Sequence, residues 1–286
     1  MNEKPLVSVI INCFNGEKYL REAIDSVMNQ TYHNWEIVLW DNQSIDSTKE
    51  IVESYHDARI KYYYAPVHTS LGKARNLALE KIEGAFVCFL DSDDVWEKNW
   101  VETFVSRFEQ DQNISLVFCR FVVDFCDHSR LNKTLLPNVD GYLTTEDFID
   151  KYSLGMSGSA IRASVIGDEG IRFNESFSLI EDYDFFIRIA SLGAIYFYAT
   201  PFFHYREHGD NLSHKAANWS KEFITLRDLI LGREATYESL VNHIDALNRK
   251  IETYKFIDLT INKKYLKAFF KHPRTFLYWL KDNHKR

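Results

Sequence analysis

Three acidic residues follow one of the most apolar stretches of the chain. The run 85–90 (Ala-Phe-Val-Cys-Phe-Leu) leads directly into Asp91, Ser92, Asp93 and Asp94. Unpaired carboxylates so close together would raise one another's pKa, so a divalent cation or basic side chains should lie between them. An Asp-x-Asp turn offers oxygen atoms to Mg²⁺ or Mn²⁺ and leaves coordination positions for a phosphate. Helix capping explains one or two of these acids but not three, so the turn predicts a metal site.

A second acidic pair, Glu181 and Asp182, begins a segment whose apolar residues recur at helical spacing. A carboxylate near a reacting hydroxyl can act as a general base. Acids are also ordinary at a helix N-terminus, where they cap the chain and interact favourably with the helix dipole. Asp184 and Arg188 are four residues apart, and a solvated ion pair is the default for that spacing. The pair alone leaves catalysis and capping open.

Several basic and imidazole side chains could also contact a phosphate or a metal. His208 could ligate a metal or contact a diphosphate, and Arg206 could clamp a phosphate, although a lone His is more often simply packed or exposed. Arg75 and Lys73, near the start of a predicted helix, could touch a diphosphate or face water. The chain has neither GxGxxG nor GxxxxGKS, which excludes dinucleotide-binding and P-loop sites.

The first ninety or so residues alternate between strand-like and helix-like segments. Apolar, β-branched runs predict strands and apolar residues at helical spacing predict helices. The predicted strands cover 6–12, 35–40, 59–64 and 85–90, and the predicted helices cover 19–27, 48–55 and 71–82. This alternation indicates an α/β fold with an open, mostly parallel, Rossmann-like sheet flanked by helices. Because ligands bind such sheets outside the carboxyl ends of the strands, Asn12, Asp41, Asn42 and the 91–94 turn should meet in one crevice.

The second half of the chain has a looser pattern. We expect a strand over 115–124, a helix from Glu181 that ends at Gly193, a strand over 194–199 and mainly helices from Asn218 onward. The segment 155–159 (Gly-Met-Ser-Gly-Ser) is small and flexible, as a backbone passing close to a ligand would be. We therefore expect a catalytic domain over 1–215, with a nucleotide-binding half 1–110 and an acceptor-binding half 111–215, and a helical extension over 216–286.

Composition and charge narrow the class of protein. The chain has 286 residues and a net charge of -7, but the tail 262–286 is strongly basic and rich in aromatic residues. An acidic body is a poor partner for a phosphate backbone, so nucleic acid is not expected as a ligand. The tail is typical either of an interfacial amphipathic segment or of a helix packed on the catalytic domain. No run is long and apolar enough to span a membrane and residues 1–8 do not resemble a signal peptide, so we expect a cytoplasmic protein.

Taken together, the order and spacing of these segments resemble those of family 2 glycosyltransferases, which are inverting, depend on nucleotide-sugar donors and have a GT-A fold. The resemblance covers about residues 5–213. It rests on segments 7–12, 41–48 and 72–76, and most of all on 89–94 and 181–185. It implies a sugar transfer in which Mn²⁺ or Mg²⁺ neutralises the departing nucleoside diphosphate.

The resemblance also implies roles for individual residues. The implied donor-binding residues are Asn12, Asp41, Asn42, Arg75, Asp91, Ser92 and Arg206. The implied metal ligands are Asp91, Asp93 and His208. Where the family usually has Asp-Asp after its second strand, this chain has Asp41-Asn42. An Asn carbonyl can still accept a hydrogen bond from N3–H of uracil, so a UDP-sugar is favoured while the base stays open.

Inversion by a single displacement needs a carboxylate that takes the proton of the attacking hydroxyl. The resemblance places Asp182 in this role, with Glu181 either as the alternative base or as a partner of a sugar hydroxyl. Neighbouring side chains on a helix point about 100° apart, so only one of the two should face the reacting centre.

The expected function is transfer of a hexosyl or N-acetylhexosaminyl group from a UDP-sugar to a hydroxyl of a glycan or lipid-linked glycan. It would take place at the inner face of the cytoplasmic membrane, with 262–286 as a peripheral contact. Two alternatives stay open. A nucleotidyltransferase on a similar fold would need a Gly-rich basic loop after the first strand, and 12–16 is not such a loop. A sugar-nucleotide-binding module without catalysis would use the same crevice.

Overall fold

The computed structural model describes residues 4–125, 128–131, 136–151, 155–209 and 219–261. The strands are β1 (Val7–Cys13), β2 (Trp35–Asp41), β3 (Ile60–Tyr64), β4 (Phe86–Phe89), β5 (Val95–Trp96), β6 (Ile114–Asp124), β7 (Ser129–Leu131), β8 (Gly141–Leu143), β9 (Ser159–Arg162) and β10 (Ala194–Arg206). The α-helices are α1 (Leu20–Met28), α2 (Thr48–Glu53), α3 (Leu71–Leu79), α4 (Trp100–Gln110), α5 (Thr145–Lys151), α6 (Ala163–Asp168), α7 (Glu181–Ala190), α8 (Trp219–Leu231) and α9 (Ile244–Ile261). Short 3₁₀ helices are η1 (Met156–Gly158) and η3 (Ala235–His243). Every strand and helix predicted up to residue 90 is present, with ends shifted by a few residues at most.

The strands form one mixed sheet in the order β3-β2-β1-β4-β9-β6-β10-β5, with β7 paired to β6 and β8 paired to β10. The N-terminal strands β3, β2, β1 and β4 are parallel, as are β6 and β10. β9 is antiparallel to both of its neighbours, β4 and β6. The predicted α/β fold with a parallel first half is confirmed, and β9 joins that half to the second.

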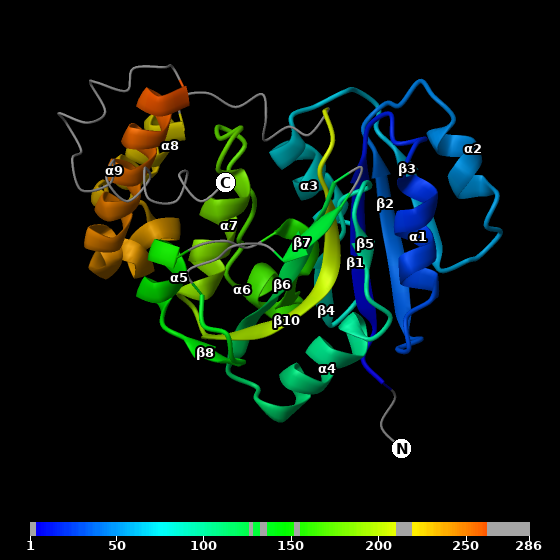
Figure 1. Ribbon diagram of the computed structural model, residues 1–286, viewed down its shortest axis with the longest axis horizontal. Coiled ribbons are helices and arrows are strands. Elements are labelled where there is room, and N and C mark those ends of the chain that lie inside the picture. The colour runs from blue at the N-terminus through cyan, green and yellow to red at the C-terminus, as the bar shows by residue number, and fades with distance from the viewer. Residues whose placement is uncertain (1–3, 126–127, 132–135, 152–154, 210–218, 262–286) are drawn as a thin grey trace.

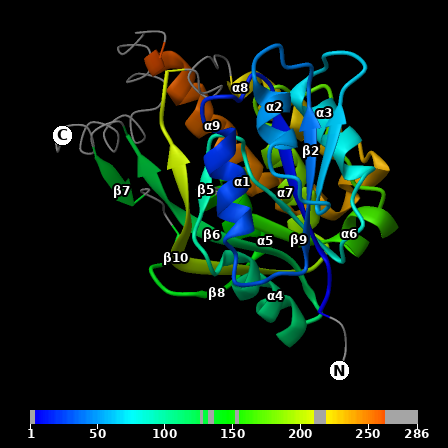
Figure 2. The same cartoon turned by 90° about the vertical axis from the view of Figure 1, so that its right-hand side faces the viewer.

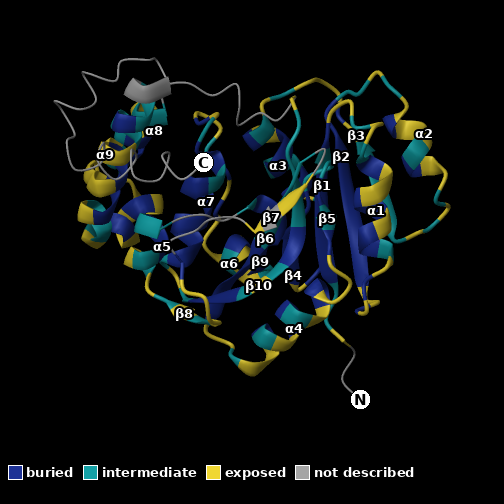
Figure 3. Cartoon of the chain, viewed as in Figure 1, coloured by how far each residue is buried: buried dark blue, intermediate teal, exposed yellow. Residues whose placement is uncertain are grey.

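Helices cover both faces of the sheet, so its central strands are buried on both sides. Val9 and Ile11 of β1 pack in one buried cluster with residues of α1 and α4, whereas Ile10 packs in the other with residues of α3 and α7. Figure 1 shows α1 and α2 on one side and α7, α8 and α9 on the other, and Figure 3 shows buried strands between helices with exposed outer surfaces. Burial on two faces explains why these strands read as continuous apolar runs.

The C-terminal helices share a core with the sheet. Phe223 of α8 and Leu247 of α9 belong to the same buried cluster as Phe186 of α7. Figure 1 shows α8 and α9 across the sheet from α1 and α2, and in Figure 2, turned by 90°, α1 and α2 lie in front of them. The helical character of this extension is confirmed, while the domain boundary near residue 215 stays a prediction. Among the described helices, none combines the length and apolarity needed to cross a membrane. The tail 262–286 lies outside the described residues, so both interpretations of it stay predictions.

The small residues of 155–159 are buried beneath the strand ends. A Cβ atom on Gly155 or Gly158 would come within 2.4 Å of the ring of Phe203 on β10. Close packing on Phe203 therefore accounts for these glycines, and the flexibility of the segment stays a prediction. β10 also extends beyond the predicted 194–199, because irregular pairing around Pro201 lets it continue along β6.

The ion pair between Asp184 and Arg188 is buried rather than solvated. Asp184 is fully buried and Arg188 is 4% exposed, and the guanidinium lies 2.5 Å from the carboxylate. Arg188 also donates to the backbone carbonyl of Arg172. The predicted pairing of Asp184 with Arg188 is confirmed. The predicted exposure to solvent is wrong, because nearly every residue of α7 is buried.

We predict that Arg188→Ala lowers the free energy of unfolding by about 3–5 kcal/mol, since it leaves Asp184 as an uncompensated buried charge. Urea denaturation followed by circular dichroism measures the loss. The matched control is Arg227→Ala, which removes an exposed pair with Asp228 and should cost less than about 1 kcal/mol. Equal losses in the two variants would contradict the structural importance of the buried pair.

Candidate functional site

The carboxyl ends of β1, β2 and β4 meet at one edge of the sheet. β1 pairs in parallel with both β2 and β4, and Cys13 lies opposite Asp41 in this register. Asn12 at the end of β1, Asp41 at the end of β2 and Asp91 just beyond β4 are therefore brought together. The structure thus contains the convergence of strand ends that the sequence predicts.

Asp94 is a buried anchor of the acidic turn. Its carboxylate accepts hydrogen bonds from the hydroxyl of Ser157 (2.5 Å) and from the backbone N–H of Arg206 (3.1 Å). The Ser157 hydroxyl in turn accepts a hydrogen bond from the backbone N–H of Asp91 at 3.0 Å. Burial raises the pKa of Asp94 well above its ordinary value. Asp94 therefore fixes the turn to η1 and β10 and leaves Asp91 and Asp93 nearer the solvent.

Asp93 and His208 lie side by side, although 115 residues separate them. The imidazole Nε2 of His208 is 2.9 Å from Oδ2 of Asp93, and its ring lies 5.1 Å from the ring of Tyr19. The structure thus pairs two of the three metal ligands implied by the sequence. Asp91 is the third, and its side chain is 41% exposed.

Arg75 links the acidic turn to the acidic pair of α7. Its guanidinium lies 3.0 Å from the carboxylate of Glu181 and 3.7 Å from that of Asp91. Arg75 and Glu181 are both nearly fully buried. Burial raises the pKa of Asp91 to about 6, an effect that Arg75 opposes and that the charges of Asp93 and Glu181 reinforce. One cation is thus shared by two parts of the candidate site.

A cluster of aromatic rings holds α7 against β4. Phe89, the last residue of β4, meets Phe173, Phe185 and Phe186 edge-on, with ring centroids 5.8–6.2 Å apart. Phe173 stacks on Phe185 at 3.9 Å and also lies under the guanidinium of Arg75. Because Phe89 precedes the acidic turn and Phe185 follows the acidic pair, this packing fixes the distance between the two clusters.

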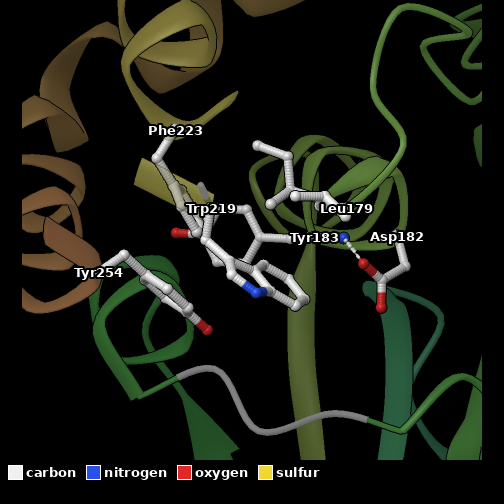
Figure 4. A pocket seen from close by; sticks show the side chains of 7 residues that line it. Leu179, Asp182, Tyr183, Trp219, Phe223 and Tyr254 are labelled. Carbon is white, nitrogen blue, oxygen red and sulfur yellow. Dashed lines mark hydrogen bonds between the residues drawn. The ribbon is translucent and has the colours of Figure 1, made fainter. Parts of the chain in front are cut away.

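Asp182 stands at the edge of a pocket of about 240 Å³ between α7 and the C-terminal helices (Figure 4). Its carboxylate accepts a hydrogen bond from the backbone N–H of Tyr183 at 2.6 Å. Burial raises the pKa of Asp182 to about 7, the charge of Glu181 adds to the rise and Arg75 opposes it. A carboxyl group with a pKa near neutrality is suited to take up a proton at physiological pH.

The polar side chains at the end of β2 are bonded within the protein. Asp41 accepts hydrogen bonds from the backbone N–H of Ser44 and the hydroxyl of Tyr62. The amide of Asn42 exchanges hydrogen bonds with the backbone of Thr69. These bonds shape the loops after β2 and β3. By contrast, the amide nitrogen of Asn12 is a buried donor with no hydrogen-bond acceptor among the described residues. Such a group is suited to donate a hydrogen bond to a ligand.

Two aromatic side chains at this edge, those of Phe14 and His68, were not predicted from the sequence. The ring of Phe14 is 51% exposed and lies 4.5 Å from the ring of His68, whose Nδ1 is 2.8 Å from the carbonyl oxygen of Asn42. An exposed aromatic residue directly after a buried strand is the signal that could have identified Phe14.

Arg206 and Ser92 lie around the same edge. Arg206 forms a salt bridge of 2.7 Å with Glu22 and its guanidinium lies 4.3 Å from the ring centroid of Tyr19. Ser92 lies beside Cys13, and its hydroxyl opposes the burial that raises the pKa of that thiol to about 12. Both residues therefore join β1 and α1 to the acidic turn, and their donor-binding roles stay predictions.

The residues present suit a hard divalent cation. Carboxylate oxygens and an imidazole nitrogen are donors that Mn²⁺ accepts. Burial is the main cause of the raised pKa of Asp91, and a cation would offset the negative charges of Asp93 and Glu181 that add to it. Within the described ranges no group of three or more His, Cys, Asp or Glu side chains is arranged closely enough to hold a metal by itself. A bound cation would therefore need further oxygen donors from water or a phosphate.

We predict that Arg75→Met lowers the free energy of unfolding by about 3 kcal/mol, because Glu181 is left buried without its cation. The double variant Arg75→Met/Glu181→Gln should recover about 1 kcal/mol or more of this loss, as measured by urea denaturation. Lys73→Met on the same helix is the control, since Lys73 is half exposed and its pair with Glu175 is long at 3.8 Å. Strictly additive losses would contradict coupling through Arg75.

The chain matches one protein-family model and is similar to several curated proteins. Residues 8–163 match the model of the family described as glycosyl transferase family 2. The chain is similar to a putative teichuronic acid biosynthesis glycosyltransferase of Bacillus subtilis, TuaG, at 33% identity over 54% of this chain and 61% of that protein. It is also similar to an Escherichia coli protein named UDP-Glc:alpha-D-GlcNAc-diphosphoundecaprenol beta-1,3-glucosyltransferase, WfgD, at 37% identity over 41% of this chain and 46% of that protein. The chain thus spans about half to three fifths of these two relatives.

Solved structures share the fold at low sequence identity. Residues 1–349 of S. aureus TarS in complex with UDP-GlcNAc give a TM-score of 0.73 at 22% identity, covering 96% of this chain and 80% of that one. A mannosyltransferase of Pyrobaculum calidifontis in complex with GDP-Man and Mn²⁺ gives 0.64 at 16% identity, covering 99% and 81%. These likenesses, together with the family match over more than half of its residues, show that the chain belongs to glycosyl transferase family 2 and has the GT-A fold.

Proposed function

We propose that the protein is an inverting glycosyltransferase that moves a sugar from a UDP-sugar to a hydroxyl group of a glycan or lipid-linked acceptor. The observation that carries the proposal is Arg75, which joins the acidic turn at Asp91 to the acidic pair on α7. The proposed diphosphate site and the proposed general base are thereby connected through one side chain. The name of WfgD, which includes UDP-Glc, and the UDP-GlcNAc bound by TarS support a nucleotide-sugar donor.

The nucleoside would bind at the ends of β1 and β2. The unpartnered amide of Asn12 offers a donor to it, and the exposed ring of Phe14 offers a face on which a base can stack. Asp41 and Asn42 are held by internal hydrogen bonds, so we propose that they act chiefly by shaping this wall. Because Asn42 is bonded to Thr69, the preference for uracil rests on the UDP-GlcNAc bound by TarS and the UDP-Glc in the name of WfgD.

The diphosphate would lie over the acidic turn. Asp91, Asp93 and His208 would hold Mn²⁺ or Mg²⁺, with Arg206 and Ser92 at the rim. When bound, the cation would offset the charge of the departing nucleoside diphosphate. Asp94 keeps the turn in place from below through Ser157 and the backbone of Arg206. The acids of the turn thus divide into a buried anchor and two more exposed donors.

Asp182 would take the proton of the acceptor hydroxyl. The carboxylate of Glu181 points to Arg75 and is held there at 3.0 Å, whereas Asp182 faces the pocket. This arrangement favours Asp182 as the base and Glu181 as the residue that positions α7 against Arg75. Deprotonated Asp182 is the active form, so the rate should rise with pH up to the pKa of this residue.

We predict that donor hydrolysis by the purified protein rises with pH and levels off above an apparent pKa near 7. At pH 5 the rate should be about a hundredfold below the plateau, because the base is then mostly protonated. Asp182→Asn should lower the rate by about 10² to 10⁴ and remove this pH dependence. The measurement is release of UDP from a UDP-sugar across pH 5–8.5.

The control for this series is Asp228→Asn, an exposed carboxylate on α8 that should leave both the rate and the pH profile unchanged. Hydrolysis that is lost only in Asp182→Asn would distinguish the enzyme from a binding module without catalysis. An unchanged pH profile in Asp182→Asn would contradict the assignment of the base.

A further inference from the structure

The pocket beside Asp182 is built mainly from the C-terminal helices. Its volume is about 240 Å³, and it is lined by Leu179, Ile180, Asp182, Tyr183, Trp219, Phe223 and Tyr254. In Figure 4 the aromatic side chains of α8 and α9 stand on one side of the pocket and Asp182 stands on the other. The aromatic residues from α8 and α9 lie beyond residues 8–163, the part of the chain that matches the family model.

Three of these rings form a nearly continuous apolar wall. Trp219 stacks on Tyr254 with centroids 5.6 Å apart and an interplanar angle of 27°, and Phe223 stacks on the same ring at 4.5 Å and 27°. Tyr183 meets Phe223 edge-on at 4.9 Å and closes the wall toward α7. The rings therefore support one another, and the wall is built before any ligand binds.

The opposite side of the pocket is polar. Asp182 provides a carboxylate there. Tyr254, which belongs to the aromatic wall, has a phenol whose pKa burial raises to about 12, with the negative charge of Asp182 adding to the rise. A ligand that fills the space must therefore present an apolar face to the rings and a hydrogen-bond donor to the carboxylate.

A pyranose ring has this combination of properties. Its axial C–H bonds form an apolar face that packs on the electron-rich face of an aromatic ring, and its equatorial hydroxyls donate to carboxylates. The volume is below the 300 Å³ or so at which pockets for drug-sized ligands begin, which favours one ring over an oligosaccharide. An alkyl chain would fit the rings but would bury Asp182 without offering it a hydrogen bond.

We infer that this pocket is the acceptor subsite, which takes a single pyranose ring with a C–H face against Trp219 and a hydroxyl directed at Asp182. The inference rests on the proposed function. In the transfer step the hydroxyl oxygen forms a bond to the anomeric carbon of the donor. The bond from that carbon to the diphosphate oxygen breaks, its electron pair leaves with the diphosphate, and the hydroxyl proton ends on Asp182. Acceptor choice is thereby assigned to α8 and α9.

The test is saturation-transfer difference NMR on the full chain with methyl glycosides of glucose, galactose and N-acetylglucosamine. Ring protons of at least one glycoside should receive saturation from the wild-type protein. Trp219→Ala, which removes the wall, and Leu179→Trp, which fills the pocket, should each weaken binding about tenfold. The matched control is Leu231→Ala, a 56% exposed residue on the same helix, which should bind like the wild type.

Calorimetric titration of each sample with UDP, together with circular dichroism, shows whether a variant is folded. If Trp219→Ala does not fold, Leu179→Trp carries the test alone, because it adds side-chain volume and opens no cavity. Ring-proton saturation that is absent for all three glycosides, or equal in the wild type and both pocket variants, would overturn the inference.

Octyl β-glucoside distinguishes a sugar from an alkyl ligand. Saturation confined to its octyl protons would show that the pocket takes an apolar chain, which also overturns the inference. A third outcome is that glycoside binding depends on Trp219 but the protein neither binds UDP nor hydrolyses a UDP-sugar. It would retain the sugar site and refute the proposed transferase function, so the two failures are distinguishable.

Discussion

The buried guanidinium of Arg75 is the constraint on which the rest of the site depends. Carboxylates from two distant parts of the chain, Asp91 after β4 and Glu181 at the start of α7, approach the same region of low polarity. Without a shared cation their mutual repulsion and the cost of removing them from water would drive α7 away from the sheet. Arg75 offsets both effects. The rings of Phe89, Phe173 and Phe185 then keep the two elements at a fixed distance.

This arrangement gives chemically similar side chains different tasks. Asp94 is buried and bonded to Ser157, so it supports the turn from within. Glu181 is oriented by Arg75, whereas its neighbour Asp182 faces the aromatic pocket and has a pKa near neutrality. The separation follows from the roughly 100° between successive side chains on a helix, which sends one acid into the protein and the other toward the cleft. The environment of each carboxyl group, rather than its type, decides its role.

Much of the fold was predictable because its first half obeys local rules. Segments such as 6–12 and 35–40 are buried on both faces and therefore read as unbroken apolar runs, and the strand-end rule then locates Asn12, Asp41 and Asp91 together. The burial of Asp184 with Arg188 and the sharing of Arg75 were not predictable. They depend on which elements pack together. When those elements are a hundred or more residues apart in the sequence, residue spacing does not predict their packing. The wall made by Trp219 and Tyr254 was not predictable for the same reason, since each residue alone is typical of an ordinary helix core.

The most direct test of the account is a calorimetric titration of the full chain with UDP-, GDP-, CDP- and dTDP-sugars, each with and without Mn²⁺. We expect a UDP-sugar to bind and Mn²⁺ to strengthen its binding, because Asp91 and Asp93 would hold the cation and its positive charge would attract the diphosphate. Binding of none of the four classes of nucleotide sugar, with or without the metal, would contradict it. Selective binding of another base would retain the site and correct the choice of uracil.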